Sequence, residues 1–423
     1  MKYFLCFLTL VITFLPPVEA AAQPRFRYDV KMGIDRLVED NYDLIAGKKV
    51  VLVTNQSGRT RTVIPTVSAI RTSPTTILQA GLTPEHGYYG IARAGETVAD
   101  STDSLDGTPL RSLYGSNRRP TREMLGDCDV VLFDVQDIGL RSYTFLSTLY
   151  NVMDACAEYN KPLIVLDRPN PLGGKIVDGN VPDSGMTSFV GIIPIPYVHG
   201  CTFGELARMT NEEGWLPRGA DSLPRRCALT VVPMQNWERW MGWEDTDFIW
   251  TPTSPHIPTV DAVRGAAMTG IWGELGIASI GIGYTLPFQM FGTPTLKTKL
   301  LLEVLQKRSF PGITVTATRY RPFYGKFVQQ DCNGLFFSFY PDMHFQPYSA
   351  GVEILLALRA VHPEMFIPLS VTEAAGAMFD KVTGSRTLLT TLFSDKSDAE
   401  VRALASRGVE EFLEKREKYL LYE

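Results

Sequence analysis

Four short segments place carboxyl, amide, imidazole or guanidinium groups directly after apolar runs. Glu85 and His86 follow "TTILQAG", and the run "CDVVLFDVQD" ends in two acids and an amide. Carboxyl and imidazole groups are the side chains that most often transfer protons in catalysis. We therefore expect acid–base chemistry at these segments, whose polar residues are Asn55, Gln56, Glu85, His86, Asp134, Gln136, Asp137, Asp167, Arg168 and Asn170.

The apolar runs that precede these residues predict strands at 48–55, 75–81, 128–137 and 161–168, with a helical pattern at 143–159. Runs that are apolar without alternation are typical of a parallel sheet covered on both faces. Ligands of open α/β sheets bind outside the carboxyl ends of the strands. Four independent strand ends therefore predict one polar crevice.

The rest of the chain predicts a second, smaller unit. A capping-box pattern at Thr202 and Glu205 marks a helix start just after His199, and the proline-rich segment 251–262 predicts an ordered loop at the cleft or between domains. The fold class is thus α/β, with a Rossmann-like domain over 24–262 and a mixed α+β domain over 263–423 that shapes the substrate site.

Residues 1–20 have one lysine, a short apolar run and small residues before a cleavage site, which indicates a signal peptide. We expect a periplasmic or secreted protein without stable membrane insertion. The net charge of −5 has no basic cluster, which argues against nucleic acid as a partner. The five cysteines after the signal peptide are an odd number without short paired spacing, so a disulfide framework is not expected.

Nucleotide, metal and serine-hydrolase signatures are missing from the sequence. No GxGxxG follows the first strand, no GxxxxGK[ST] or GxSxG occurs, and the histidines show no HExxH spacing. The glycine pair in "RPNPLGGKIVDG" follows two prolines that oppose a helix start. We therefore expect no cofactor and no metal, and an ester or amide hydrolase is the least favoured class.

Several blocks of the sequence resemble one bacterial family. They include "VLVTNQSG", "TPEHGYYG", "FDVQDIGLRSYT", "VLDRPNPLGG", "SPHIPT" and "LPFQMFGTP", in this order. Together they resemble the exo-β-N-acetylmuramidase family, formerly DUF1343 and now glycoside hydrolase family 171. The resemblance implies a Rossmann-like domain joined to a smaller C-terminal domain with a cleft between them. It also implies release of terminal N-acetylmuramic acid from the non-reducing end of peptidoglycan fragments, with Glu85 as the catalytic acid.

Glycoside cleavage usually needs two carboxyl groups, and the second one stays open. Asp134 and Asp137 fit best, with Asp167 and Glu205 behind them. In the alternative, the acetamido group of the sugar attacks, with Asp134 or Gln136 near it. His86 could orient Glu85 or bind a hydroxyl. Arg141 or Arg168 could hold the lactyl carboxylate, and the expected polar wall includes Asn55, Gln56, Tyr143, Asn170 and His199.

One segment departs from the family pattern. Where members commonly carry Asn-x-Ser-x-Gly-Arg-Gly-Thr, this chain reads "IASIGIGYT", with Ile277 at the asparagine and Ile282 at the arginine. The substrate choice of this chain could therefore differ. The alternative function is a catalytically weakened protein that binds muropeptides or other carbohydrates. The oligomeric state is not predicted.

Overall fold

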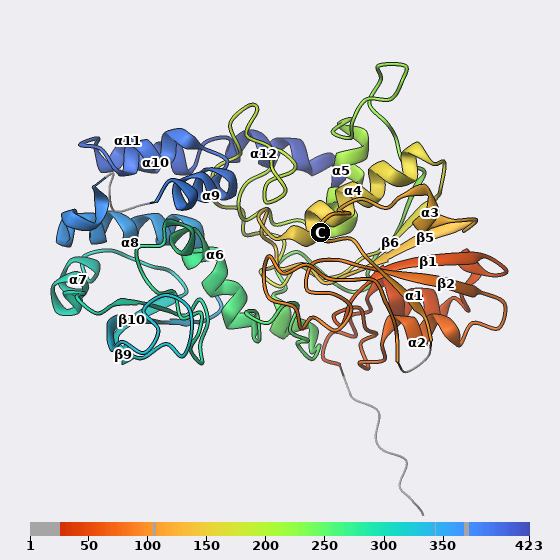
Figure 1. Cartoon of the computed structure of the whole chain (residues 1–423), viewed down its shortest axis with the longest axis horizontal. Coiled ribbons are helices and arrows are strands. Elements are labelled where there is room, and N and C mark those ends of the chain that lie inside the picture. Colours follow the sequence, from red (N-terminus) through yellow and green to blue (C-terminus); the bar gives the residue numbers. More distant parts are fainter. Residues whose placement is uncertain (1–25, 105–106, 343, 368–371) are drawn as a thin grey trace, which may run out of the picture.

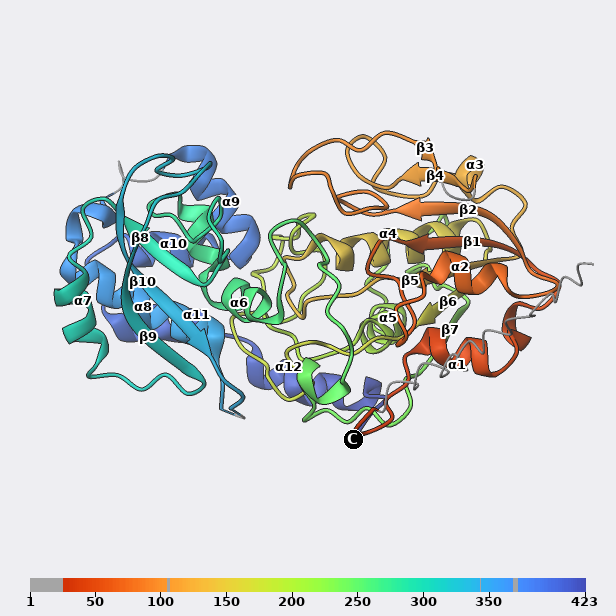
Figure 2. The same ribbon diagram turned by 90° about the horizontal axis from the view of Figure 1, so that it is seen from below.

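The computed structural model describes residues 26–104, 107–342, 344–367 and 372–423, so the expected signal peptide lies outside the described residues. Two sheets lie toward opposite ends of the long axis, and helix α6 (Val260–Leu275) lies between them (Figures 1 and 2). The polar strand ends therefore belong to one part of the molecule, and a separate body of chain lies beyond them.

Within the described residues, the larger sheet has seven strands in the order β3-β4-β2-β1-β5-β6-β7. All neighbouring pairs are parallel except β3 with β4. The predicted parallel sheet is thus confirmed. Its strands are β1 (Lys49–Thr54), β2 (Ile77–Thr83), β3 (Ser101–Thr102), β4 (Pro109–Ser112), β5 (Val130–Asp134), β6 (Leu163–Leu166) and β7 (Leu229–Val232).

Helices cover both faces of this sheet, as the apolar strands predicted. Val51, Val131 and Phe133 point to one face and pack in a core with helices α4 and α5. Leu52 and Leu132 point to the other face and pack with α1 and α2. Successive strand residues alternate between faces, so a strand buried on both sides must be apolar throughout. These helices are α1 (Gly33–Glu39), α2 (Thr66–Arg71), α4 (Thr144–Glu158) and α5 (Phe203–Glu212), with α3 (Arg122–Leu125) leading into β5.

The second unit is a three-stranded antiparallel sheet, in the order β8-β10-β9, packed with helices. Its core combines apolar residues of α6 and α8 with Phe291, Leu335 and Phe337 from the sheet. This is the mixed α+β region that the sequence predicted. Its elements are β8 (Met290–Thr293), α7 (Thr298–Leu305), β9 (Ile313–Tyr320), β10 (Cys332–Phe339), α8 (Pro347–Val361), α9 (Glu373–Thr383), α10 (Arg386–Leu392) and α11 (Asp398–Ala405).

The end of the chain returns to the first unit. Phe412 of α12 (Val409–Arg416) and Tyr419 are buried in the core that holds α4 and α5. Figure 1 shows α12 reaching toward α5. The boundary predicted at 262/263 falls inside the continuous helix α6. The burial of Phe412 and Tyr419 shows that the end of the chain packs on the domain that was predicted to end at 262, because these side chains complete its core.

Three further observations concern the described part of the chain. Cys128, Cys156, Cys201, Cys227 and Cys332 are free and buried. No group of three or more His, Cys, Asp or Glu residues there could hold a metal ion. None of the helices in the described ranges has the length and apolar character needed to cross a membrane.

Candidate active site

A cavity of about 800 Å³ lies where loops of the first unit meet α6, the loop before β8, and α9. Glu85 and His86 line it from the segment after β2, and Ser254, His256 and Ile257 line it from the proline-rich loop. The prediction that this loop forms a wall of the cleft is confirmed. The volume falls in the range of small-molecule sites, which is about 300–1,000 Å³.

Glu85 is buried at the wall of this cavity and meets neutral donors. Its Oε1 accepts the backbone N–H of Gly95 at 2.9 Å, and its Oε2 meets the hydroxyl of Thr144 at 2.6 Å. A backbone N–H can only donate, whereas a hydroxyl can donate or accept. Both oxygens of Glu85 therefore meet neutral groups.

Tyr114 and Tyr143 both line the cavity and both respond to the charge of Glu85. Burial, and then a hydrogen bond with Glu85, raise the pKa of Tyr114 to about 12. Burial raises the pKa of Tyr143, to which the charges of Asp137 and Glu85 add. Tyr88 and Tyr89 are not part of the lining, and Tyr89 is half exposed. The aromatic wall therefore comes from other segments than the one that carries Glu85.

His86 has a positive φ of 73°, an uncommon value for a residue with a side chain. Its Nδ1 lies 2.8 Å from the carbonyl oxygen of Ala92. A carbonyl only accepts, so Nδ1 carries the proton and Nε2 of the neutral ring is left as an acceptor. His86 can accordingly accept a hydrogen bond from a hydroxyl in the cavity.

Asp137 and His199 lie outside the cavity lining but close to it. The Nδ1 atom of His199 accepts the N–H of Cys201 at 3.2 Å, and its Nε2 lies 3.2 Å from Oδ2 of Asp137. Oδ1 of Asp137 is buried without a hydrogen-bond partner. The charge of Asp137 contributes to the raised pKa of Tyr143, whose side chain lines the cavity.

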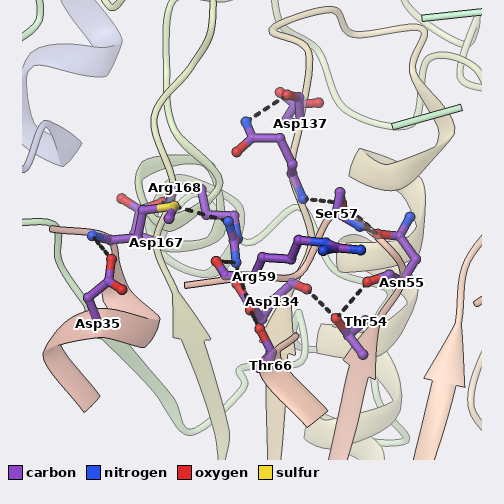
Figure 3. A network of polar contacts seen from close by, with 12 residues as sticks. Asp35, Thr54, Asn55, Ser57, Arg59, Thr66, Asp134, Asp137, Asp167 and Arg168 are labelled. Carbon is purple, nitrogen blue, oxygen red and sulfur yellow. Dashed lines mark hydrogen bonds and ion pairs between the residues drawn. The ribbon is translucent and has the colours of Figure 1, made fainter. Parts of the chain in front are cut away.

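Asp134 and Arg168 were predicted to belong to the site, but they form a buried pair with each other instead (Figure 3). Both are buried, neither lines the cavity, and Asp134 accepts two bonds from the guanidinium of Arg168, at 2.5 and 2.9 Å. Thr66 donates to the same carboxylate. The pair is turned toward α2, so Asp134 has no access to a sugar in the cavity and Arg168 has no free edge for a lactyl carboxylate.

Arg141 also lies outside the cavity lining, fully buried. Its Nη1 donates to the carbonyls of Asn180 and Ile195 at 2.6 and 2.7 Å, and its Nη2 donates to those of Val382 and Thr383, both at 2.9 Å. Burial lowers the pKa of Arg141 to about 10. Both Nη atoms are thus engaged by protein carbonyls, and these hydrogen bonds tie the end of α9 to the first unit.

The remaining predicted binding residues support loops. Gln56 donates to the carbonyls of Pro252 and Thr253, and the hydroxyl of Tyr143 lies 2.8 Å from that of Thr253, so both hold the proline-rich loop. Asn55 receives two bonds from Ser57 (Figure 3). Gln136 donates to the carbonyls of Asp137 and Pro169, and Asn170 donates to that of Cys201. Of this set, only Tyr143 lines the cavity.

Other charged residues of the cavity lie in segments that the sequence reasoning did not select. They are Arg118, Glu274, Lys326 and Lys381. None of them comes directly after one of the four predicted strands, which was the pattern used for the prediction. Glu274 had one available signal, because it is the one charged residue in the mostly apolar stretch 265–275.

Comparison with known proteins covers both units. Residues 50–261 match the N-terminal model, and residues 267–422 the C-terminal model, of the exo-β-N-acetylmuramidase NamZ. The peptidoglycan β-N-acetylmuramidase NamZ of Bacillus subtilis is 34% identical over 427 residues, which is 100% of both chains.

Two crystal structures of DUF1343 family proteins from Bacteroides fragilis have the same fold. One has a TM-score of 0.86 at 37% identity and covers 95% of this chain and 100% of its own. The other has a TM-score of 0.73 at 27% identity and covers 93% of this chain and 99% of its own. With both units matched and the whole length aligned, the chain belongs to the exo-β-N-acetylmuramidase family.

Proposed function

We propose that this protein is an exo-acting glycosidase that releases terminal N-acetylmuramic acid from the non-reducing end of peptidoglycan fragments. The observation that carries this proposal is Glu85, a buried carboxyl that opens onto the cavity and meets only neutral donors there. Glu85 protonates the oxygen of the departing sugar. Membership of the family supports the same reaction.

The transition state of glycoside hydrolysis resembles an oxocarbenium ion, which a second group must stabilise. Asp137 is the carboxyl that best fits this requirement, since it and Glu85 both act on Tyr143. Asp137 does not line the cavity, so it would act on the transition state from a distance, by its charge. Attack by the acetamido oxygen of the substrate is the other route, and it needs no second carboxyl in contact with the sugar.

The proposal is tested with a chromogenic N-acetylmuraminide. We expect turnover by the wild type and a loss of about 10²- to 10⁴-fold in kcat for Glu85→Gln, the usual contribution of a general acid. Glu96→Gln is the matched control, because Glu96 lies in the same loop, is exposed and is not part of the cavity lining. It should retain wild-type activity.

The alternative is a carbohydrate-binding protein that no longer cleaves its ligand. Ile282 favours it, since an apolar side chain lines the cavity where family members commonly carry an arginine. Binding of N-acetylmuramic acid without release of the chromophore by the wild type would establish this alternative. Full activity of Glu85→Gln would instead remove Glu85 from the catalytic role.

We also propose that the protein is exported and acts in the periplasm or outside the cell, where peptidoglycan fragments occur. The sequence of residues 1–20 supports this proposal. The mass of the protein recovered from its native host tests it. A mature chain starting near Ala20 or Ala22 is expected, and an intact Met1 would contradict export by this route.

A further inference from the structure

The charges around the cavity do not neutralise one another. Three cations line it, Arg118, Lys326 and Lys381, and all three are exposed. Within the described ranges, none of them forms an ion pair. The acids of the lining are Glu85 and Glu274. Glu85 is bound by neutral donors, and burial alone raises the pKa of Glu274, with no cation acting on it.

Arg118 is the cation of the lining whose charge acts on the same tyrosine as Glu85. Tyr114 responds to both residues, since Glu85 raises its pKa and the charge of Arg118 lowers it. The guanidinium carbon of Arg118 lies 4.3 Å from the ring centroid of Phe189 and 5.5 Å from that of Tyr114. Stacking on a ring restrains a guanidinium while its N–H groups stay free at the edge of the plane.

We infer that Arg118 binds the carboxylate of an acidic sugar and thereby selects N-acetylmuramic acid over uncharged N-acetylglucosamine. This inference rests on the proposed function. Arg141 and Arg168, the two arginines suggested by the sequence, are buried among protein acceptors, whereas Arg118 has an open edge in the cavity.

The chemistry of the substrate fits this position. Muramic acid differs from glucosamine by a lactyl ether at C3 of the same ring that carries the scissile bond at C1. Its carboxylate must therefore lie within a few bonds of the group that Glu85 protonates. A planar guanidinium can bind a carboxylate through two parallel N–H bonds, which a lysine ammonium cannot do. Lys326 and Lys381 belong to the second unit and are the competing candidates.

The experiment compares three chromogenic substrates: the N-acetylmuraminide, its lactyl methyl ester and the N-acetylglucosaminide. For Arg118→Ala we expect kcat/KM for the muraminide to fall by about 10- to 100-fold, the usual loss for a charge-assisted hydrogen bond. For the ester and the glucosaminide, kcat/KM should fall far less. The ratio of kcat/KM for the free acid to that for the ester is therefore expected to decrease. Arg118→Lys should retain part of this preference.

Arg122→Ala is the matched control. Arg122 is also exposed and also stacks on an aromatic ring, that of Tyr159 at 4.8 Å, but it is not part of the cavity lining. It should behave as the wild type. An unchanged acid-over-ester preference in Arg118→Ala would overturn the inference, as would loss of that preference in Lys326→Ala or Lys381→Ala instead.

A binding measurement separates this inference from the proposed function. Titration of the Glu85→Gln protein with free N-acetylmuramic acid and with N-acetylglucosamine reports affinity without turnover. If the wild type cleaves no muraminide, the proposed activity fails. Even then, Arg118 would be supported as the carboxylate site if adding Arg118→Ala to Glu85→Gln weakens binding of N-acetylmuramic acid but not of N-acetylglucosamine. Unchanged binding of N-acetylmuramic acid would overturn the inference.

Discussion

Two regions of the molecule differ in whether their charged side chains are paired with one another. At the carboxyl end of the large sheet, Asp134 is paired with Arg168 and Glu205 with Arg239, and all four side chains are buried. In the cavity, Glu85 and Arg118 have no charged partner among the described residues, although both act on Tyr114. Buried charges are tolerated when they are paired and hydrogen-bonded. The first region therefore holds the fold together, whereas the second keeps its charges available for a ligand.

The difference also explains why the strand-end pattern is ambiguous. An acid at a strand end can face the crevice, as Glu85 does, or turn sideways to a cation of the next strand, as Asp134 does toward Arg168. Both positions place a polar residue after an apolar run. Only the partner of each acid shows which one is structural.

Removal of the arginine from the buried pair should have the largest effect on stability. Arg168→Ala leaves Asp134 buried without its cation, so we expect a loss of about 3–5 kcal/mol in the free energy of unfolding. Arg118→Ala, at an exposed position, should change it by no more than about 0.5 kcal/mol. Urea denaturation of both variants measures the contrast. Equal losses would show that the two regions do not differ as described.

The second prediction concerns Asp167, which also lies in the buried region. Burial raises the pKa of Asp167 from 3.8 to about 6, and the charge of Glu205 contributes to the rise. The folded state thus keeps a proton that the unfolded state has already released, so stability falls as the pH rises from about 4 through about 6. The shift is worth up to about 3 kcal/mol.

The variant Asp167→Asn cannot titrate and should flatten this part of the stability profile. Unfolding in urea at a series of pH values between about 4 and about 7 measures the slope. Asn has only one acceptor oxygen, so it loses the hydrogen bonds that Thr202 and Tyr422 donate to Oδ2, and its stability should be lower overall. Only the slope therefore tests the prediction. An unchanged slope would mean that another group causes the pH dependence.

The smallest effect is expected at Glu274 of the cavity. Burial raises the pKa of Glu274, and no ion pair compensates for its charge within the described residues. Glu274→Gln should therefore stabilise the fold at neutral pH, by roughly 1 kcal/mol, the scale of an unsatisfied buried polar group. The melting temperature measures this gain. Glu303→Gln, an exposed acid of α7, is the control and should leave the melting temperature unchanged.

Much of the fold was predictable because its signals are local. Apolar runs without alternation predicted the strands of the parallel sheet, and Thr202 with Glu205 predicted the capping box at the start of α5, which the structure confirms. Pro65 directly precedes α2, which begins at Thr66, since proline is tolerated only at a helix start. Gly408 has a φ of 83° and lies between α11 and α12, where it ends the first of these helices before the second begins.

The sequence by itself determined that Glu85 and His86 follow a strand, and both line the cavity, although only the last three residues of that strand, β2, are buried. Only the tertiary structure decided which other charges join them. Arg118, Glu274, Lys326 and Lys381 come from segments that are distant in sequence, and no periodicity brings them together. In the sequence, Arg141 and Arg168 look as suitable as any other arginine for binding a substrate carboxylate. Whether a guanidinium binds a protein acceptor instead depends on where it points after the chain has packed. Long-range packing, rather than local pattern, therefore decided which cations line the cavity.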